Sequence, residues 1–158
     1  MSTNQPEREQ CAKIMTIAIR YLSRREYSRR ELSGKLLART FAIEDIETVL
    51  DNLEQQGYLN DERFAEMFLR SQISRGNGPF KIKMALSQKG VDNALISQLF
   101  DGANIDWLHN ADKVRRKHFG EQLPTDHNSL SKQIRYLRNK GFYQEHIDAV
   151  LNANKRED

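Results

Sequence analysis

The sequence repeats a pattern of apolar residues about every 50 residues, and this repeat limits the possible folds more than any other feature. Leu36, Leu86 and Leu137 occupy equivalent positions, spaced 50 and 51 residues apart. Four further positions in this register are apolar in every copy: Phe41, Val91 and Phe142; Ile46, Ile96 and Ile147; Val49, Leu99 and Val150; and Leu50, Phe100 and Leu151. A fixed period of this kind predicts a tandem array of similar units.

Each copy predicts three helices. The leading helices contain apolar residues at helical spacing within 14–22, 64–73 and 107–119, with Asn60 or Asp61 and Asn104 or Asp106 as candidate caps for the second and third. The middle helices are predicted to start after equivalent N-cap residues, with Pro79 at the first helical position of the second copy. Those three N-cap residues are Ser28, Gly78 and Ser129.

Glycine is predicted to end three of these helices. Gly90 and Gly141 follow the second and third middle helices, where a residue without a Cβ can adopt a positive φ. Thr40 departs from this pattern in the first copy. The last helix of the first copy carries one apolar stripe, from Ile46 to Leu53, and is predicted to end at Gly57.

Composition agrees with helices rather than strands. Charged residues make up 30% of the chain and apolar residues 38%, which suits several thin cores better than one thick core. We therefore predict an all-α protein of three tandem three-helix repeats. The predicted boundaries are a disordered N-terminus at 1–10, repeats at 11–59, 60–103 and 104–152, and a disordered C-terminus at 153–158. The stretch 121–129 is the longest predicted connection and a candidate flexible joint.

The net charge of +3 hides an alternation of basic and acidic segments. Residues 24–39 hold six basic and two acidic residues, 41–66 hold one basic and eight acidic, and 70–90 hold five basic and none acidic. Favourable interaction with helix C-termini accounts for Arg39, Lys89 and Lys140 as well as partner binding does, but it does not explain Lys81 and Lys83 early in their helix. The basic runs favour binding of a polyanion or an acidic protein groove.

The residues do not suggest a catalytic or metal site. Four histidines lack the spacing of a zinc helix, and Cys11 is the only cysteine. The string Gly76, Asn77 and Gly78 before Pro79 has no phosphate-loop continuation, so we interpret it as a turn into a helix. No stretch has the length and apolarity of a membrane span or signal core. We predict a cytoplasmic, non-enzymatic, monomeric binding protein with no cofactor, metal or small-molecule substrate.

Three segments of the sequence resemble those of a known protein family. The segment GYLNDERFAEMFLRSQISRGNGPFKIKMALSQKG, residues 57–90, resembles the most recognisable part of the RecX family, bacterial regulators of the recombinase RecA. REYSRRELSGKL (25–36) and NIDWLHNADKVRRKHFGEQLP (104–124) are also similar to that family. The resemblance spans about residues 13–151, although Thr40 replaces the glycine that is usual after the first such helix.

The resemblance implies that three tandem three-helix repeats form an elongated, curved array, and it also implies a partner. It implies binding in the groove of the RecA filament on DNA, with inhibition of ATP hydrolysis, strand exchange and co-protease activity, in recombination, DNA repair and the SOS response. Single- and double-stranded DNA are implied partners, directly or through RecA. The basic runs leave open the alternative of an autonomous helical DNA-binding protein that does not depend on RecA.

The predicted partner surface consists of basic side chains along the chain: Arg24, Arg25, Arg29, Arg30, Lys35, Arg39, Arg70, Arg75, Lys81, Lys83, Lys89, Arg115, Arg116, Lys117, Lys132, Arg135, Arg138 and Lys140. The residues of the family motif are predicted to be mainly structural: Gly57, Tyr58, Leu59, Asp61, Arg63, Phe64, Gly76, Gly78, Pro79 and Gly90.

Overall fold

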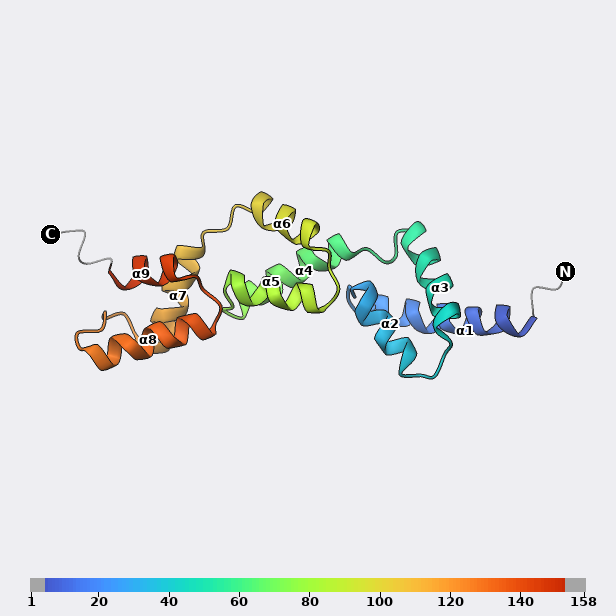
Figure 1. The fold of residues 1–158 in the computed structure, drawn as a ribbon, viewed down its shortest axis with the longest axis horizontal. Coiled ribbons are helices and arrows are strands. Elements are labelled where there is room, and N and C mark those ends of the chain that lie inside the picture. The colour runs from blue at the N-terminus through green and yellow to red at the C-terminus, as the bar shows by residue number, and fades with distance from the viewer. Residues whose placement is uncertain (1–4, 153–158) are drawn as a thin grey trace. The chain divides into compact units, whose positions relative to one another are not determined.

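The computed structural model describes residues 5–152, which form helices joined by turns and loops (Figure 1). In chain order the helices are α1 (Gln5–Leu22), α2 (Arg29–Leu37), α3 (Ile43–Gln55), α4 (Asp61–Ser74), α5 (Pro79–Gln88), α6 (Asn93–Gly102), α7 (Trp107–Phe119), α8 (His127–Asn139) and α9 (Gln144–Leu151). Within the described residues no strand occurs. The all-α class and the tandem three-helix organisation are therefore confirmed, whereas the elongated, curved form of the array stays a prediction.

These helices belong to two compact units. The first contains the residues up to Met67 together with Ser87–Leu95, and the second contains Phe68–Leu86 together with the residues from Ile96 onward. Parts of α4, α5 and α6 thus belong to each unit. The predicted boundaries between the three repeats stay a prediction.

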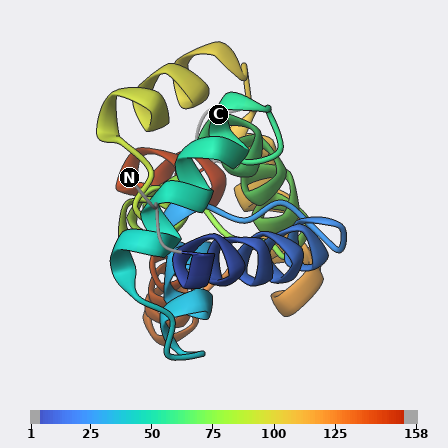
Figure 2. The same cartoon turned by 90° about the vertical axis from the view of Figure 1, so that its right-hand side faces the viewer.

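Each unit has an apolar core built on one set of three helices. In the first unit α3 packs against α1 and α2 (Figure 2). Its core includes Ile14, Leu36 and Leu50, none of which is exposed. In the second unit α7, α8 and α9 pack together around Leu137 and Ile147. Leu36, Leu50, Leu137 and Ile147 are all positions of the predicted register, so the repeat marks the cores.

In the first unit, the end of α5 contacts the start of α2. Ser28 caps α2, and its hydroxyl donates a hydrogen bond of 2.8 Å to the carbonyl oxygen of Lys89, directly after α5. The Lys89 ammonium also pairs with Glu31 at 2.9 Å. Gly90 has a φ of +84°, and a Cβ on it would lie 2.8 Å from the Cβ of Arg30. Only a glycine fits between these two helix ends without displacing a neighbour.

In the second unit, the end of α8 contacts the start of α5 in the same way. The backbone N–H of Gly78 donates to the carbonyl oxygen of Lys140 at 2.7 Å, and that of Phe80 donates to Gly141 at 2.9 Å. Gly141 has a φ of +98°, and a Cβ on it would lie 2.7 Å from the backbone nitrogen of Lys81. We call these two contacts the helix-end junctions.

The start of α8 corrects one prediction. Ser129 is not its N-cap; the helix begins at His127, and the N-cap is Asp126, whose carboxylate accepts hydrogen bonds from the backbone N–H and the hydroxyl of Ser129. These hydrogen bonds hold the pKa of Asp126 below its usual range. The helix thus starts one turn earlier than predicted and has its own cap, and among the described residues no helix end docks at Ser129.

The N-terminal prediction also needs correction. Gln5–Gln10 were predicted to be disordered, but they form the start of α1. Pro6 lies in the first turn, where its missing N–H has no helical partner to lose, and Glu7 favours the same end electrostatically. The remaining residues of the two predicted disordered ends, 1–4 and 153–158, lie outside the described residues.

The connection between α7 and α8 is held at its start by Arg115. This side chain is only 1% exposed. Its guanidinium donates to the carbonyl oxygens of Gly120 at 3.3 Å, Glu121 at 3.2 Å and Gln122 at 3.3 Å. The loop places these three carbonyl oxygens around the planar guanidinium, whose several N–H donors can bond to all of them. Arg115 was predicted to lie on the partner surface, but its burial makes it a structural residue.

We expect Gly141→Ala to destabilise the protein more than Gly57→Ala. Both glycines have a positive φ, but a Cβ on Gly57 would have no atom within 4 Å of it. Alanine at such a φ costs about 1–2 kcal/mol, and overlap with Lys81 should add about 1–3 kcal/mol for Gly141 alone. Unfolding in urea, followed by circular dichroism, measures both; equal losses would contradict a tight junction.

For Arg115→Ala we expect a loss of about 2–4 kcal/mol in unfolding free energy, because three carbonyl groups lose a buried charged donor. Arg115→Lys should also be destabilised, because an ammonium group lacks the planar, forked N–H donors of a guanidinium. Arg116→Ala is the matched control: Arg116 is exposed and pairs with Asp112, so its loss should cost about 0–1 kcal/mol. Equal stability of the two alanine variants would return Arg115 to the candidate partner surface.

Candidate functional site

Motif residues in the first unit hold the turns beside the junction. Asp61 accepts a hydrogen bond of 2.8 Å from the backbone N–H of Arg29, at the start of α2. Arg63 donates to the carbonyl oxygens of Gly57 and Tyr58 and pairs with Glu26. Both side chains thus satisfy backbone or charged groups within the fold, which is a structural role.

The other motif residues lie at core or turn positions, with one exception. Leu59 and Phe64 are buried, Gly76 follows α4 with a φ of +85°, and Pro79 is the first residue of α5. Tyr58 differs, because it is 55% exposed. The segment Gly76–Pro79 therefore ends one helix and starts the next, as predicted from the sequence.

Several of the predicted basic residues serve the fold. Arg29 bridges from α2 to Glu47, Asp51 and Glu54. Burial alone would raise the pKa of Glu31, but hydrogen bonds from Arg25, Lys89 and the backbone of Ser28 lower it below its usual range. In total, five of the predicted basic residues form salt bridges: Arg25, Arg29, Lys89, Arg115 and Arg116.

Four more contact carbonyls, amides or aromatic rings. Arg30 donates to the carbonyl oxygen of Gln88, and Arg138 donates to the side chain of Gln144. The ammonium of Lys83 lies 4.9 Å from the ring centre of Phe100 and 5.6 Å from that of Tyr143, and Lys140 lies over Tyr136. These contacts orient the cations without neutralising them, so each keeps its charge available to a partner.

The remaining predicted cations are exposed and form no ion pair with the described residues. They are Arg24, Lys35, Arg39, Arg70, Arg75, Lys81, Lys117, Lys132 and Arg135. Exposed cations without a partner are the side chains that an acidic ligand can engage at the lowest desolvation cost.

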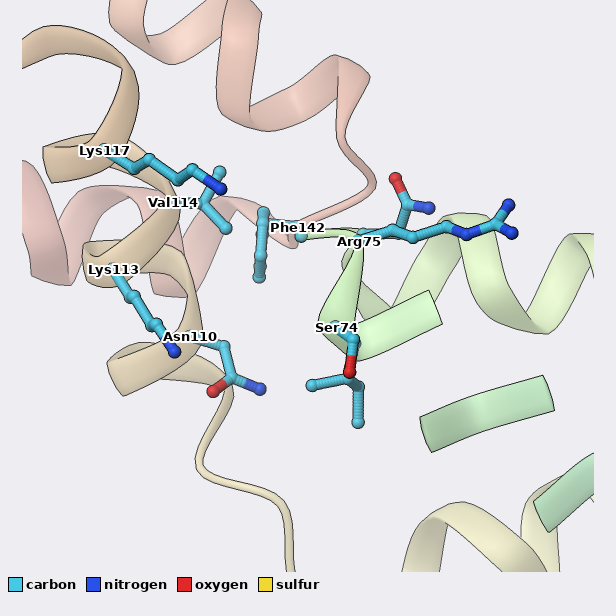
Figure 3. Close-up of a pocket in the computed structure, with 10 residues that line it drawn as sticks. Ser74, Arg75, Asn110, Lys113, Val114, Lys117 and Phe142 are labelled. Atoms are coloured by element: carbon cyan, nitrogen blue, oxygen red, sulfur yellow. The ribbon is translucent and has the colours of Figure 1, made fainter. Parts of the chain in front are cut away.

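In the second unit, two of these cations line a hollow of about 270 Å³ between the end of α4 and α7 (Figure 3). Arg75 lies at its rim, with its guanidinium directed away from α7 in this view, whereas Lys113 and Lys117 project from α7 with their ammonium groups directed toward the hollow. Ile73, Val114 and Phe142 supply apolar lining, while Ser74 and Asn110 add a hydroxyl and an amide. We call this feature the basic hollow.

The spacing along α7 keeps the two lysines unpaired. Asp112 pairs with Arg116, four residues on, at 2.8 Å and lies 3.6 Å from Arg115. Lys113 and Lys117 are also four residues apart, on an adjacent strip of the helix, and neither pairs with an acid among the described residues. No aspartate or glutamate lines the basic hollow. Its charge and shape suit one anionic group attached to an apolar neighbour.

Sequence reasoning placed Lys117 and Arg75 on the partner surface but missed Lys113 and Asn110. The signal for Lys113 was present in its spacing from Lys117, which puts both on one strip of a helix. The proximity of Arg75 to α7 depends on tertiary packing. It is set partly by Gly76, where a Cβ would lie 3.2 Å from Val114.

The described residues contain no group of three or more side chains that could hold a metal ion. Within the same part of the chain, no helix is long and apolar enough to cross a membrane.

Comparison with protein families matches two segments. Residues 15–53 match the model described as RecX, first three-helix domain, and residues 60–99 match RecX, second three-helix domain. The first segment covers the last part of α1, all of α2 and most of α3, and the second covers α4, α5 and most of α6.

Whole-chain relatives agree with these matches. The chain is 38% identical to "Regulatory protein RecX" of Halorhodospira halophila, over 92% of this chain and 90% of the relative. It is also 38% identical to "Regulatory protein RecX" of Acinetobacter baylyi, over 91% and 87%. The crystal structure of RecX from Lactobacillus salivarius has the same fold, with a TM-score of 0.77 and 22% identity over 94% of this chain and 98% of that one. On this evidence the chain belongs to the RecX family of regulatory proteins.

Proposed function

We propose that this protein regulates the recombinase RecA by binding its filament on DNA. Membership of the RecX family is the observation that carries this proposal. Binding in the filament groove would inhibit ATP hydrolysis, strand exchange and co-protease activity, without any catalysis by this chain. A monomer that acts in the cytoplasm meets these requirements.

The unpaired cations support a partner with acidic groups. Nine of the predicted basic side chains are exposed and form no ion pair with the described residues. A filament on DNA offers both carboxylates and phosphates, and cations of this kind attract either. Bridging of neighbouring RecA subunits would favour one arrangement of those subunits, and hydrolysis that depends on changing it would slow.

Within this proposal, the basic hollow receives one acidic group of the filament. Lys113 and Lys117 supply two ammonium groups without an internal partner, and the Asn110 amide can donate a further hydrogen bond. The apolar lining accepts the aliphatic or aromatic part of the same segment. The contact is local, so its effect can be separated from that of net charge.

We expect substoichiometric protein to slow ATP hydrolysis by RecA on single-stranded DNA. Lys113→Gln with Lys117→Gln should raise the concentration needed for half-inhibition about tenfold, because a loss of about 1.4 kcal/mol in binding corresponds to that factor. Lys132→Gln with Arg135→Gln is the matched control, since it removes two exposed charges from α8 in the same unit. It should change half-inhibition less than about threefold.

Each result decides one part of the proposal. An unchanged hydrolysis rate at saturating wild-type protein would contradict regulation of RecA. Equal effects of the two double variants would show that net charge, not the basic hollow, determines binding. The alternative of RecA-independent DNA binding predicts tight, salt-sensitive affinity for single-stranded DNA alone, lowered by the hollow variant as much as inhibition is.

A further inference from the structure

Thr40 stands at the position that glycine occupies in both helix-end junctions. In the repeat register, Arg39 and Thr40 are equivalent to Lys89 and Gly90 in the first unit's junction. Thr40 has a φ of 67°, a conformation that β-branched residues rarely adopt. The backbone at the end of α2 therefore has a positive φ, as in both junctions, but the residue there is threonine instead of glycine.

The side chain of Thr40 also uses the acceptor on which a junction depends. Its hydroxyl donates a hydrogen bond of 2.6 Å to the carbonyl oxygen of Arg39. The equivalent carbonyl of Lys89 accepts the Ser28 hydroxyl. Among the described residues no helix start docks at Arg39, and Thr40 is exposed. Thr40 thus competes for the acceptor, which has two lone pairs, and adds a Cβ where glycine leaves space.

The start of α8 is closed in a complementary way. Ser129 is equivalent to Ser28, whose hydroxyl reaches the next helix end. The hydroxyl of Ser129 instead lies 3.1 Å from the Asp126 carboxylate, which also accepts its backbone N–H at 2.6 Å. The donor that a further junction would use is therefore engaged within its own helix.

We propose that Thr40 and Asp126 block head-to-tail association of this chain with a second copy. Without them, α8 would start after Ser129 as α2 starts after Ser28, and the hydroxyl of Ser129 in one molecule would donate to the carbonyl of Arg39 in another, as Ser28 donates to Lys89 within the chain. Such a contact joins different surfaces on the two molecules, so it would propagate into open chains. This inference goes beyond the proposed function and does not depend on it.

The test opens one end in each of two variants. Thr40→Gly frees the end of α2, and Asp126→Ala frees the start of α8. Each variant alone should stay monomeric in sedimentation velocity, because its opposite end is still closed. An equimolar mixture should form a 1:1 dimer and nothing larger, whereas the double variant should form chains whose mean mass rises with concentration and falls on dilution.

Three controls make the test specific. Thr40→Ala removes the hydroxyl but keeps the Cβ, so it should not pair with Asp126→Ala. Adding Ser129→Ala to Asp126→Ala removes the donor and should abolish the dimer with Thr40→Gly. Circular dichroism checks that helix content is retained, and Asp126→Gly replaces Asp126→Ala if that variant is unstable, because glycine is tolerated at a helix N-cap.

The proposal is wrong if the mixture and the double variant remain monomeric at concentrations up to about 1 mM, a range in which contacts worth about 4 kcal/mol are half-occupied. Self-association of either single variant to the same extent as the mixture would also overturn it, because the two ends would then not be complementary.

Discussion

The fold depends on how the ends of short helices find hydrogen-bond partners. Every α-helix leaves its first N–H groups and last carbonyl groups without partners in the helix itself. Here the carbonyl groups after α5 and α8 meet the starts of α2 and α5, through Lys89 and Ser28 in one unit and Lys140 and Gly78 in the other. One contact therefore satisfies two helix ends. Each of its hydrogen bonds contributes about 1 kcal/mol to the stability of the fold.

This constraint determines which residues can serve a partner. Residues close to a junction are drawn into it: Lys89 pairs with Glu31, and Arg29 receives the Asp61 carboxylate at its backbone N–H. Nine other predicted cations form no ion pair with the described residues. The basic segments noted in the sequence thus divide into structural and available residues, and the basic hollow with Lys113 and Lys117 belongs to the second kind.

Much of the fold could be predicted because the register carries the core. Leu36, Leu137 and their neighbours recur at a fixed interval, and burial follows that interval. Local end signals were less reliable. Ser129 has the right residue type for a cap, yet whether it caps α8 depends on whether another helix end arrives there, and a local pattern contains no such information.

The candidate site was predictable only in part, for a similar reason. A cation in a basic run can face solvent, a carboxylate or a loop, and its residue type does not distinguish these. Arg115 lies beside Arg116 in one run, but Arg115 is buried among carbonyl groups while Arg116 is exposed. Helical spacing separates the two faces of α7, whereas the approach of Arg75 requires the tertiary structure.

Hydrogen exchange at the start of α5 tests this account most directly. The amides of Gly78 and Phe80 donate across the junction to Lys140 and Gly141. Those of Glu44 and Asp45 lie in the first turn of α3, whose N-cap Ala42 offers no side-chain acceptor. We predict slow exchange at Gly78 and Phe80, comparable with amides in helix interiors. Exchange there as fast as at Glu44 and Asp45 would contradict the claim that helix-end junctions hold the fold together.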